Sequence, residues 1–253
     1  MTSRNRNNLE NLLICAGLFF IAIVMSVYFY LMGGIFRSFR MLTILFLVIA
    51  IVVLIAGHLF VKISKKDIRF HWLFLLAIPF LFFNLIGAIS PVTDTDGAGY
   101  HLAMPKIYLQ KDGFVYHPNV ISNWPMSGEM LYVPLIYLGV PPKLIHFFFG
   151  ILSALLIYCI TKRYFDHKVA AWASVITYTI PMVVLESGIA YVDLFFSFYI
   201  VAGLYCAYRA IDENSPWLFV LSSVLIGFGA SIKWHGPIFV ALAFVFISIA
   251  LKK

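Results

Sequence analysis

The feature that most constrains the fold of this chain is a series of unbroken apolar runs, each about 20 residues long. A helix of about that length crosses the hydrocarbon core of a bilayer, which is about 30 Å thick. The runs consist of Leu, Ile, Phe, Val and Ala, and they lack the alternation of β-barrel strands. With 62% hydrophobic and 11% charged residues, the chain is predicted to be an all-α, polytopic integral membrane protein.

We expect about eight transmembrane helices in a single transmembrane domain over residues 1–253. The expected spans are residues 12–32, 41–61, 72–89, 144–160, 169–185, 194–208 and 217–232, with a short eighth span that ends at Lys252 and Lys253. The basic N-terminus precedes an apolar run without a convincing cleavage site, which predicts a retained helix and not a signal peptide.

The distribution of Lys and Arg predicts the orientation of these helices. The densest basic cluster, KISKKDIRFH, follows the second span, and TKRYFDHK follows the fourth. If the N-terminus is cytoplasmic, only six of the 18 Lys and Arg residues face outside: Arg37, Arg40, Lys106, Lys111, Lys143 and Lys233. The excess of bases on the other side is typical of cytoplasmic loops, so residues 90–142 are predicted to form an exoplasmic loop of a cytoplasmic-membrane protein. The net charge of +7 comes from these clusters and does not indicate nucleic-acid binding.

Residues 90–139 are the one long segment that is not a plain apolar helix. We expect a partly amphipathic helix at residues 97–110 that stops at Gly113, and a second short helix at residues 128–138 that kinks at Pro134. Both would lie in the membrane interface and roof a cavity.

Three separate polar segments are predicted to emerge on the same face. The loop carries carboxylates, the link ESGIAYVD between the fifth and sixth spans carries Glu186 and Asp193, and the turn KWHGP carries Lys233 and His235. Ionisable groups at the membrane edge are costly unless they are hydrated or used, so this face is the candidate site, with Glu186 its weaker member.

The segment DGAGYHLAMPKIYLQKDG, followed by NWPMSGEMLY, resembles the first large exoplasmic loop of GT-C-fold membrane glycosyltransferases. The resemblance is strongest to lipopolysaccharide-modifying sugar transferases of the Rgt type, and weaker to protein O-mannosyltransferases and lipid A aminoarabinose transferases. AYVDLFFSFY and GASIKWHGP also look like later segments of this superfamily, so the resemblance covers about residues 94–238. Its members usually place the loop after the first span and continue beyond the eighth, so we expect an N-terminal portion or a short form.

The resemblance implies an inverting transferase that moves a sugar from a polyprenyl phosphate to an acceptor at the outer face of the membrane. In that superfamily an Asp at the mouth of the loop, followed four residues later by Tyr, is the catalytic carboxylate, which corresponds to Asp96 and Tyr100 here. The chemistry needs a general base for the acceptor hydroxyl and a cation for the phosphate leaving group. We assign these roles to Asp96 and Lys233, with His235 behind the lysine.

Further side chains are candidates for substrate binding. Trp124 is placed to stack on a sugar, and Glu129 could bind sugar hydroxyls or the acceptor. The complete predicted binding set is Asp94, Tyr100, His101, Trp124, Glu129, Asp193, Lys233 and His235.

Each main candidate also has a simpler structural interpretation. Asp96 suits a helix N-cap, Lys233 could extend from a helix end to the lipid headgroups, and Glu129 could merely face water. His101 could simply pack against its neighbours.

No resident cofactor is predicted, because the lipid-linked sugar donor is a substrate. Asp94 and Asp96 form an Asp-x-Asp pair that could hold a hard cation together with phosphate oxygens, but two carboxylates alone make an incomplete site. We therefore predict no metal site and leave metal dependence open. The three cysteines lie in expected spans without metal-binding spacing and are predicted to be buried thiols: Cys15, Cys159 and Cys206.

The predicted partners are a polyprenyl-phosphate sugar, membrane lipids, and an acceptor that is a glycan, a lipid or a protein. Two other functions stay open. One is a transporter or flippase of a lipid-linked sugar, although no inverted repeat links the two halves of the chain. The other is a truncated, non-catalytic homologue that binds lipid.

Overall fold

The computed structural model describes residues 8–33, 39–60, 70–118 and 120–250 of the chain. All regular elements within these ranges are helical, which confirms the predicted all-α class. Part of the predicted charge distribution lies outside the described residues: Arg4, Arg6, Arg37, Lys62, Lys65, Lys66, Arg69, Lys252 and Lys253.

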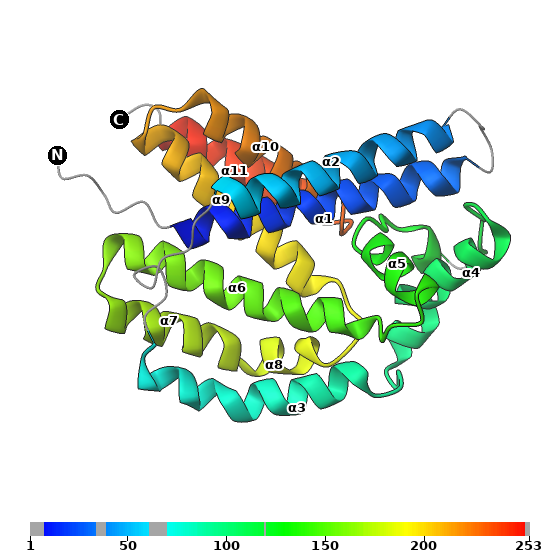
Figure 1. Ribbon diagram of the computed structural model, residues 1–253, viewed down its shortest axis with the longest axis horizontal. Coiled ribbons are helices and arrows are strands. Elements are labelled where there is room, and N and C mark those ends of the chain that lie inside the picture. Colours follow the sequence, from blue (N-terminus) through cyan, green and yellow to red (C-terminus); the bar gives the residue numbers. More distant parts are fainter. Residues whose placement is uncertain (1–7, 34–38, 61–69, 119, 251–253) are drawn as a thin grey trace.

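The predicted spans correspond to helices in the structure (Figure 1). The longest are α1 (Asn8–Met32), α2 (Phe39–Phe60), α6 (Lys143–Tyr164) and α9 (Asp193–Asp212). The others are η1 (Trp72–Ala77, 3-10) with α3 (Ile78–Ile89), α7 (His167–Thr179) with α8 (Pro181–Ser187), α10 (Pro216–Ala230) and α11 (Gly236–Ala250).

Length and composition support fewer membrane crossings than predicted. Four helical segments in the described ranges can cross a bilayer: Asn8–Met32, Trp72–Ile89, Lys143–Tyr164 and Asp193–Asp212. The count rises to five if α7 and α8 form one broken span, while three apolar helices are shorter: Met41–Gly57, Pro216–Ala230 and Gly236–Ile249. The described residues thus hold four or five helices that are long and apolar enough to cross a membrane, as in a membrane protein, and the count of eight is not confirmed.

The predicted fifth span, residues 169–185, is broken between α7 and α8. The two helices meet at an angle of 63°. Pro181 disfavours helical backbone at the residue before it, and Ile180 accordingly has φ −54° and ψ 126°. The break directs α8 toward the polar end of the molecule.

The helices pack as antiparallel neighbours around an aromatic core. α1 packs mainly on α2, α6 on α7, and α9 on α10, and α6 also contacts α9. Phe149 of α6 lies at the centre, with its ring 4.7 Å from that of Phe195 and 5.2 Å from that of Phe198. Figure 1 shows α4 and α5 together at one end of the long helices.

The other end of the bundle holds a buried ion-pair cluster. Glu10 of α1 is 1% exposed, and its Oε1 lies 3.1 Å from Arg209 of α9 and 3.5 Å from Arg163 of α6. Its Oε2 accepts a 2.5 Å hydrogen bond from the Tyr205 hydroxyl. Glu213 binds both arginines from the rim of the cluster, at 2.7 and 2.9 Å. These contacts tie together three helices that are distant in the sequence.

The segment from 90 to 142 folds into short helices. They are η2 (Gly97–His101, a π-helical turn), α4 (Ala103–Lys111), η3 (Ile121–Asn123, 3-10), η4 (Glu129–Leu131, 3-10) and α5 (Tyr132–Tyr137). The first predicted helix, expected over 97–110, is a π-helical turn followed by α4 and runs to Lys111. Asp112, and not Gly113, takes the left-handed conformation that ends it, with φ 51°. Gly113 then donates its N–H to the Tyr108 carbonyl, which closes the helix.

The second predicted helix is part of the protein core and not a purely interfacial one. All residues from 126 to 133 are buried. The helix is 3-10 before Tyr132 and α after it, so Pro134 falls in the first turn of α5, where its missing N–H is tolerated. This burial fixes Glu129 firmly in place.

Candidate active site

Three segments far apart in the sequence meet at the end of the bundle that carries α4 and α5. They are the segment 90–142, the link between α8 and α9, and the link between α10 and α11. Gly128 marks their meeting point, because a Cβ atom there would lie 2.8 Å from Val192 Cγ1 and 3.0 Å from Ile232 Cγ2. Only glycine permits this close approach without displacing the other two segments.

The three segments enclose a pocket of about 70 Å³. It is lined by Tyr100, His101, Trp124, Pro125, Met126, Glu129, Val192, Ile232, Lys233, Trp234 and His235. Most of the residues proposed from the sequence for substrate binding therefore share one cavity: Tyr100, His101, Trp124, Glu129, Lys233 and His235.

A buried His–Glu pair forms one wall of this pocket. His101 Nδ1 lies 2.7 Å from Glu129 Oε1, and the two residues are 3% and 2% exposed. Glu129 therefore does not merely face water. Its second oxygen, Oε2, is buried and has no hydrogen-bond partner among the described residues. A buried carboxylate oxygen without a partner is costly, and this one belongs to a residue that lines the pocket, which makes Glu129 a candidate for ligand binding.

Lys233 lines the pocket and pairs with Asp193, the first residue of α9. The lysine side chain is 23% exposed and the aspartate 31%. Lys233 therefore turns toward the link that carries Asp193. An ammonium group has three donors, so this lysine can bind an anion while it keeps its contact with Asp193. His235 lies beside it, with its ring 5.2 Å from that of Phe196.

The helix cap expected from the Asp96 side chain is provided by Asp94 instead. Asp94 Oδ1 accepts a 2.5 Å hydrogen bond from the Gly97 N–H, whereas the Asp96 side chain makes no capping hydrogen bond. Asp96 thus occupies the N-cap position of η2, as its simpler interpretation expected, but its side chain does not cap the helix. Its carboxylate is exposed and not used by the helix end.

Asp96 lies one helical turn before Tyr100, outside the residues that line the pocket. Burial, and then the negative charges of Asp96 and Glu129, raise the pKa of the Tyr100 phenol. The phenol therefore stays a neutral hydrogen-bond donor at physiological pH. The rings of Tyr100 and Tyr191 pack against His101, at 4.0 and 5.3 Å between centroids.

Sequence reasoning missed Tyr191, which lies on the link AYVD. Burial and the charges of Asp96 and Asp94 raise its pKa, so the phenol lies within electrostatic reach of both carboxylates. Its carbonyl accepts a hydrogen bond from the buried Tyr132 hydroxyl. An aromatic residue two positions before Asp193 was the available signal.

His146 and Lys143 of α6 were also missed, and both hold the site segments in place. His146 is fully buried: its Nδ1 lies 2.8 Å from the Glu186 carbonyl oxygen, and its Nε2 accepts from the Leu194 N–H at 3.1 Å. Lys143 Nζ donates to the Pro91 carbonyl at 3.2 Å. Glu186 itself is 7% exposed and contributes its backbone to this support.

Metal ligands do not gather at this site. Among the described residues, no three His, Cys, Asp or Glu side chains are arranged to hold a metal ion. The three cysteines are free thiols, and Cys159 and Cys206 are buried.

The site combines carboxylates, a cation and buried hydrogen-bonding groups at the end of apolar helices, which suits a membrane enzyme acting on a polar, anionic substrate. Residues 129–253 match the family model of the dolichyl-phosphate-mannose-protein mannosyltransferases. Over these residues, just under half of the chain, the protein is similar to that family, and this similarity supports the resemblance to GT-C-fold membrane glycosyltransferases found in the sequence. Searches of the curated proteins and of the solved structures found no match.

The matched range divides the candidate site. It contains Glu129, Asp193, Lys233 and His235, whereas the segment with Asp94, Asp96, Tyr100, His101 and Trp124 precedes it. The roles of all these residues stay predictions.

Proposed function

We propose that this protein transfers a sugar from a polyprenyl phosphate to an acceptor hydroxyl at the outer face of the cytoplasmic membrane. The observation that carries this proposal is the pocket in which Lys233 meets the His101–Glu129 pair. A phosphate-linked sugar needs a cation to bind its phosphate, and it needs side chains that accept hydrogen bonds from its hydroxyls. The residues that line this pocket offer both. The family match adds a mannosyl phosphate as the first donor to test.

The leaving group is the part of the donor that needs positive charge. As the bond between the anomeric carbon and the phosphate oxygen breaks, the electron pair moves to the phosphate. We assign Lys233 to balance this charge, because it lines the pocket and its pairing with Asp193 holds the flexible side chain in position. The apolar tail of the donor would remain in the bilayer beside the helices.

The nucleophile is an acceptor hydroxyl that loses its proton as it attacks the anomeric carbon. Asp96 is our candidate general base, because its carboxylate is exposed and not used in capping. Attack opposite to the departing phosphate inverts the anomeric centre. The proton ends on the Asp96 carboxylate, and the new bond joins the acceptor oxygen to the sugar.

The remaining groups would orient the sugar. Glu129 Oε2 can accept from a sugar hydroxyl, while His101 fixes the other oxygen of that carboxylate. Tyr100 provides a neutral donor between Asp96 and the pocket. The outer location is supported by the sequence distribution of Lys and Arg.

The proposal is tested by replacing Lys233 with methionine, which keeps the length of the side chain and removes its charge. The purified chain in nanodiscs is given a radiolabelled polyprenyl-phosphate mannose, and sugar transfer to a membrane extract is measured. We expect Lys233→Met to lower the transfer rate about 100-fold, comparable to removing one group that stabilises a transition-state charge. Lys106→Met is the matched control, because Lys106 is exposed and outside the pocket.

Equal transfer rates in Lys233→Met and Lys106→Met would contradict the proposed donor site. Movement of the labelled lipid between leaflets without any transfer, at the same rate in both variants, would instead favour the flippase. Binding of the lipid without transfer or movement would favour the non-catalytic homologue.

A further inference from the structure

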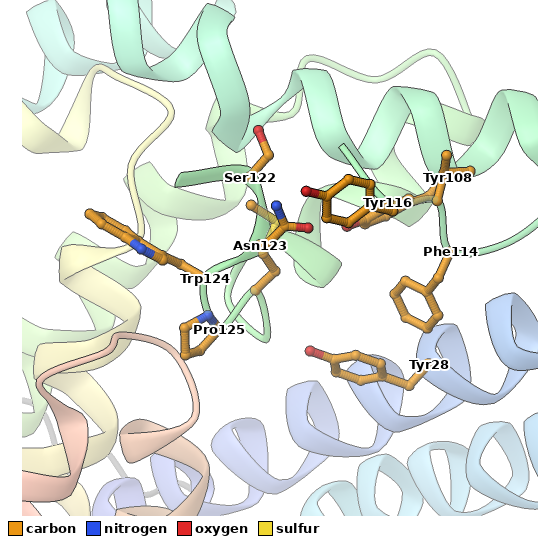
Figure 2. Close-up of a pocket in the computed structure, with 10 residues that line it drawn as sticks. Tyr28, Tyr108, Phe114, Tyr116, Ser122, Asn123, Trp124 and Pro125 are labelled. Carbon is orange, nitrogen blue, oxygen red and sulfur yellow. The ribbon is translucent and has the colours of Figure 1, made fainter. Parts of the chain in front are cut away.

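We propose that an uncharged aromatic groove beside the pocket binds the acceptor, and that this acceptor is a neutral glycan. The assignment of the groove as an acceptor site rests on the proposed transferase function, whereas its affinity for neutral glycans stands on the groove itself. Figure 2 shows the groove and the residues that line it.

The groove has a volume of about 600 Å³, within the usual range of about 300 to 1,000 Å³ for ligand sites. It is more open to the outside of the protein than the small pocket next to it, so it can admit a chain that continues beyond the groove. Its lining residues are Tyr28, Tyr108, Phe114, Val115, Tyr116, Ser122, Asn123, Trp124, Pro125 and Met126.

One wall of the groove is a continuous row of aromatic rings. Phe114 lies between Tyr28 and Tyr108, with centroid distances of 5.6 and 5.1 Å. The Tyr28 hydroxyl is held by Ser127 at 3.1 Å, which fixes its ring on the wall. A rigid aromatic row with hydroxyl groups at its edges offers flat apolar surface and hydrogen bonds together, which matches the apolar faces and equatorial hydroxyls of sugar rings.

The charge of the lining distinguishes the groove from the pocket. None of the residues that line the groove is Asp, Glu, Lys, Arg or His, whereas the pocket contains Glu129 and Lys233. A charged acceptor would leave its charge uncompensated in the groove, so the chemistry favours a neutral ligand. The two cavities thus separate an anionic donor from an uncharged acceptor.

The groove and the pocket share a border. Trp124, Pro125 and Met126 line both cavities, so a ligand in one lies next to a ligand in the other. Figure 2 shows the ring of Trp124 turned away from Tyr28 and Phe114. This shared border is what an acceptor site next to a donor site requires.

Tyr116 supplies the variant that tests the groove. It is 79% exposed, so its truncation should leave folding intact, and Figure 2 shows its ring across the groove from that of Tyr28. Tyr137 of α5 is the matched control, because it is 77% exposed and does not line the groove.

The experiment measures binding of the purified chain in nanodiscs to an array of neutral oligosaccharides of two to six units, with acidic oligosaccharides, polyprenyl phosphates and neutral peptides on the same array. We expect a neutral oligosaccharide to bind best. Tyr116→Ala should weaken its binding about twofold to tenfold, the effect of losing one aromatic contact, while Tyr137→Ala should not.

Preferential binding of a lipid, a peptide or an acidic glycan would overturn the proposal, as would the absence of oligosaccharide binding or an equal affinity in both tyrosine variants. The binding measurement needs no turnover, so it separates the two proposals. If Tyr116→Ala weakens glycan binding but Lys233→Met retains full transfer, the groove stands and the proposed donor chemistry fails.

Discussion

Two buried glutamates at opposite ends of the bundle have opposite surroundings. Glu10 is 1% exposed, and both of its carboxylate oxygens have partners: two arginines at Oε1 and the Tyr205 hydroxyl at Oε2. Glu129 is 2% exposed, but His101 contacts only one of its oxygens. The other oxygen has no partner within the described ranges, although its residue lines a cavity.

The difference separates a carboxylate whose two oxygens both have partners from one with an oxygen that has none. A buried charge whose lone pairs are occupied joins helices together and has little capacity left for a ligand. A buried carboxylate with a spare oxygen carries an unfavourable desolvation cost that a ligand can relieve. Burial alone would have ranked these two residues equally, and only their partners distinguish them.

The largest effect on stability is expected at Glu10, whose two carboxylate oxygens both have partners. Glu10→Gln removes the negative charge between Arg163 and Arg209 and leaves two largely buried cations with fewer partners. We expect the free energy of unfolding to fall by about 3 to 5 kcal/mol, measured by chemical denaturation in mixed micelles. Transfer per folded molecule should stay unchanged.

Asp212→Asn is the control for that variant, because Asp212 lies at the rim, 3.6 Å from Arg163, with a side chain that is 27% exposed. Its loss should cost less than about 1 kcal/mol. Similar losses in both variants would show that Glu10 has no special part in the cluster.

Replacement of Glu129 should affect substrate binding more than stability. Glu129→Gln keeps an oxygen that can accept a hydrogen bond from His101, and it keeps the side-chain volume. The free energy of unfolding should therefore change much less than in Glu10→Gln. The substitution removes the charge that would bind sugar hydroxyls, so the KM for the donor should rise about tenfold. The measurement is a titration of the labelled donor at equal amounts of folded protein. An unchanged KM, combined with a large loss of stability, would make Glu129 a second structural carboxylate.

The positions of the helices were predictable from the sequence, because unbroken apolar runs determine where a membrane helix forms. The break before Pro181 was not predicted, because the apolar run continues across the proline. The number of crossings was less predictable, because hydropathy does not distinguish a span from a short apolar helix packed on others.

The site was predictable as far as topology determines which segments meet. The loop, the link with Asp193 and the turn with Lys233 had to emerge at one end if the helices alternate in direction. It was not predictable that Asp94, and not Asp96, would cap the following turn, because either carboxylate could have done so. The support from His146 depends on contacts across 40 and 48 residues. No local pattern encodes such a contact.

The central claim is that Asp96, whose carboxylate makes no capping hydrogen bond, is the general base of a transferase. The variant Asp96→Asn tests this claim most directly. Transfer from the labelled donor is measured at equal amounts of folded protein in the wild type, Asp96→Asn and Asp94→Asn. Asparagine at position 94 can still accept from the Gly97 N–H, so that variant controls for the local fold. We predict that Asp96→Asn lowers the rate by two decades or more, on the order expected for a lost general base, while Asp94→Asn retains much more activity. Equal rates in all three proteins would contradict the account.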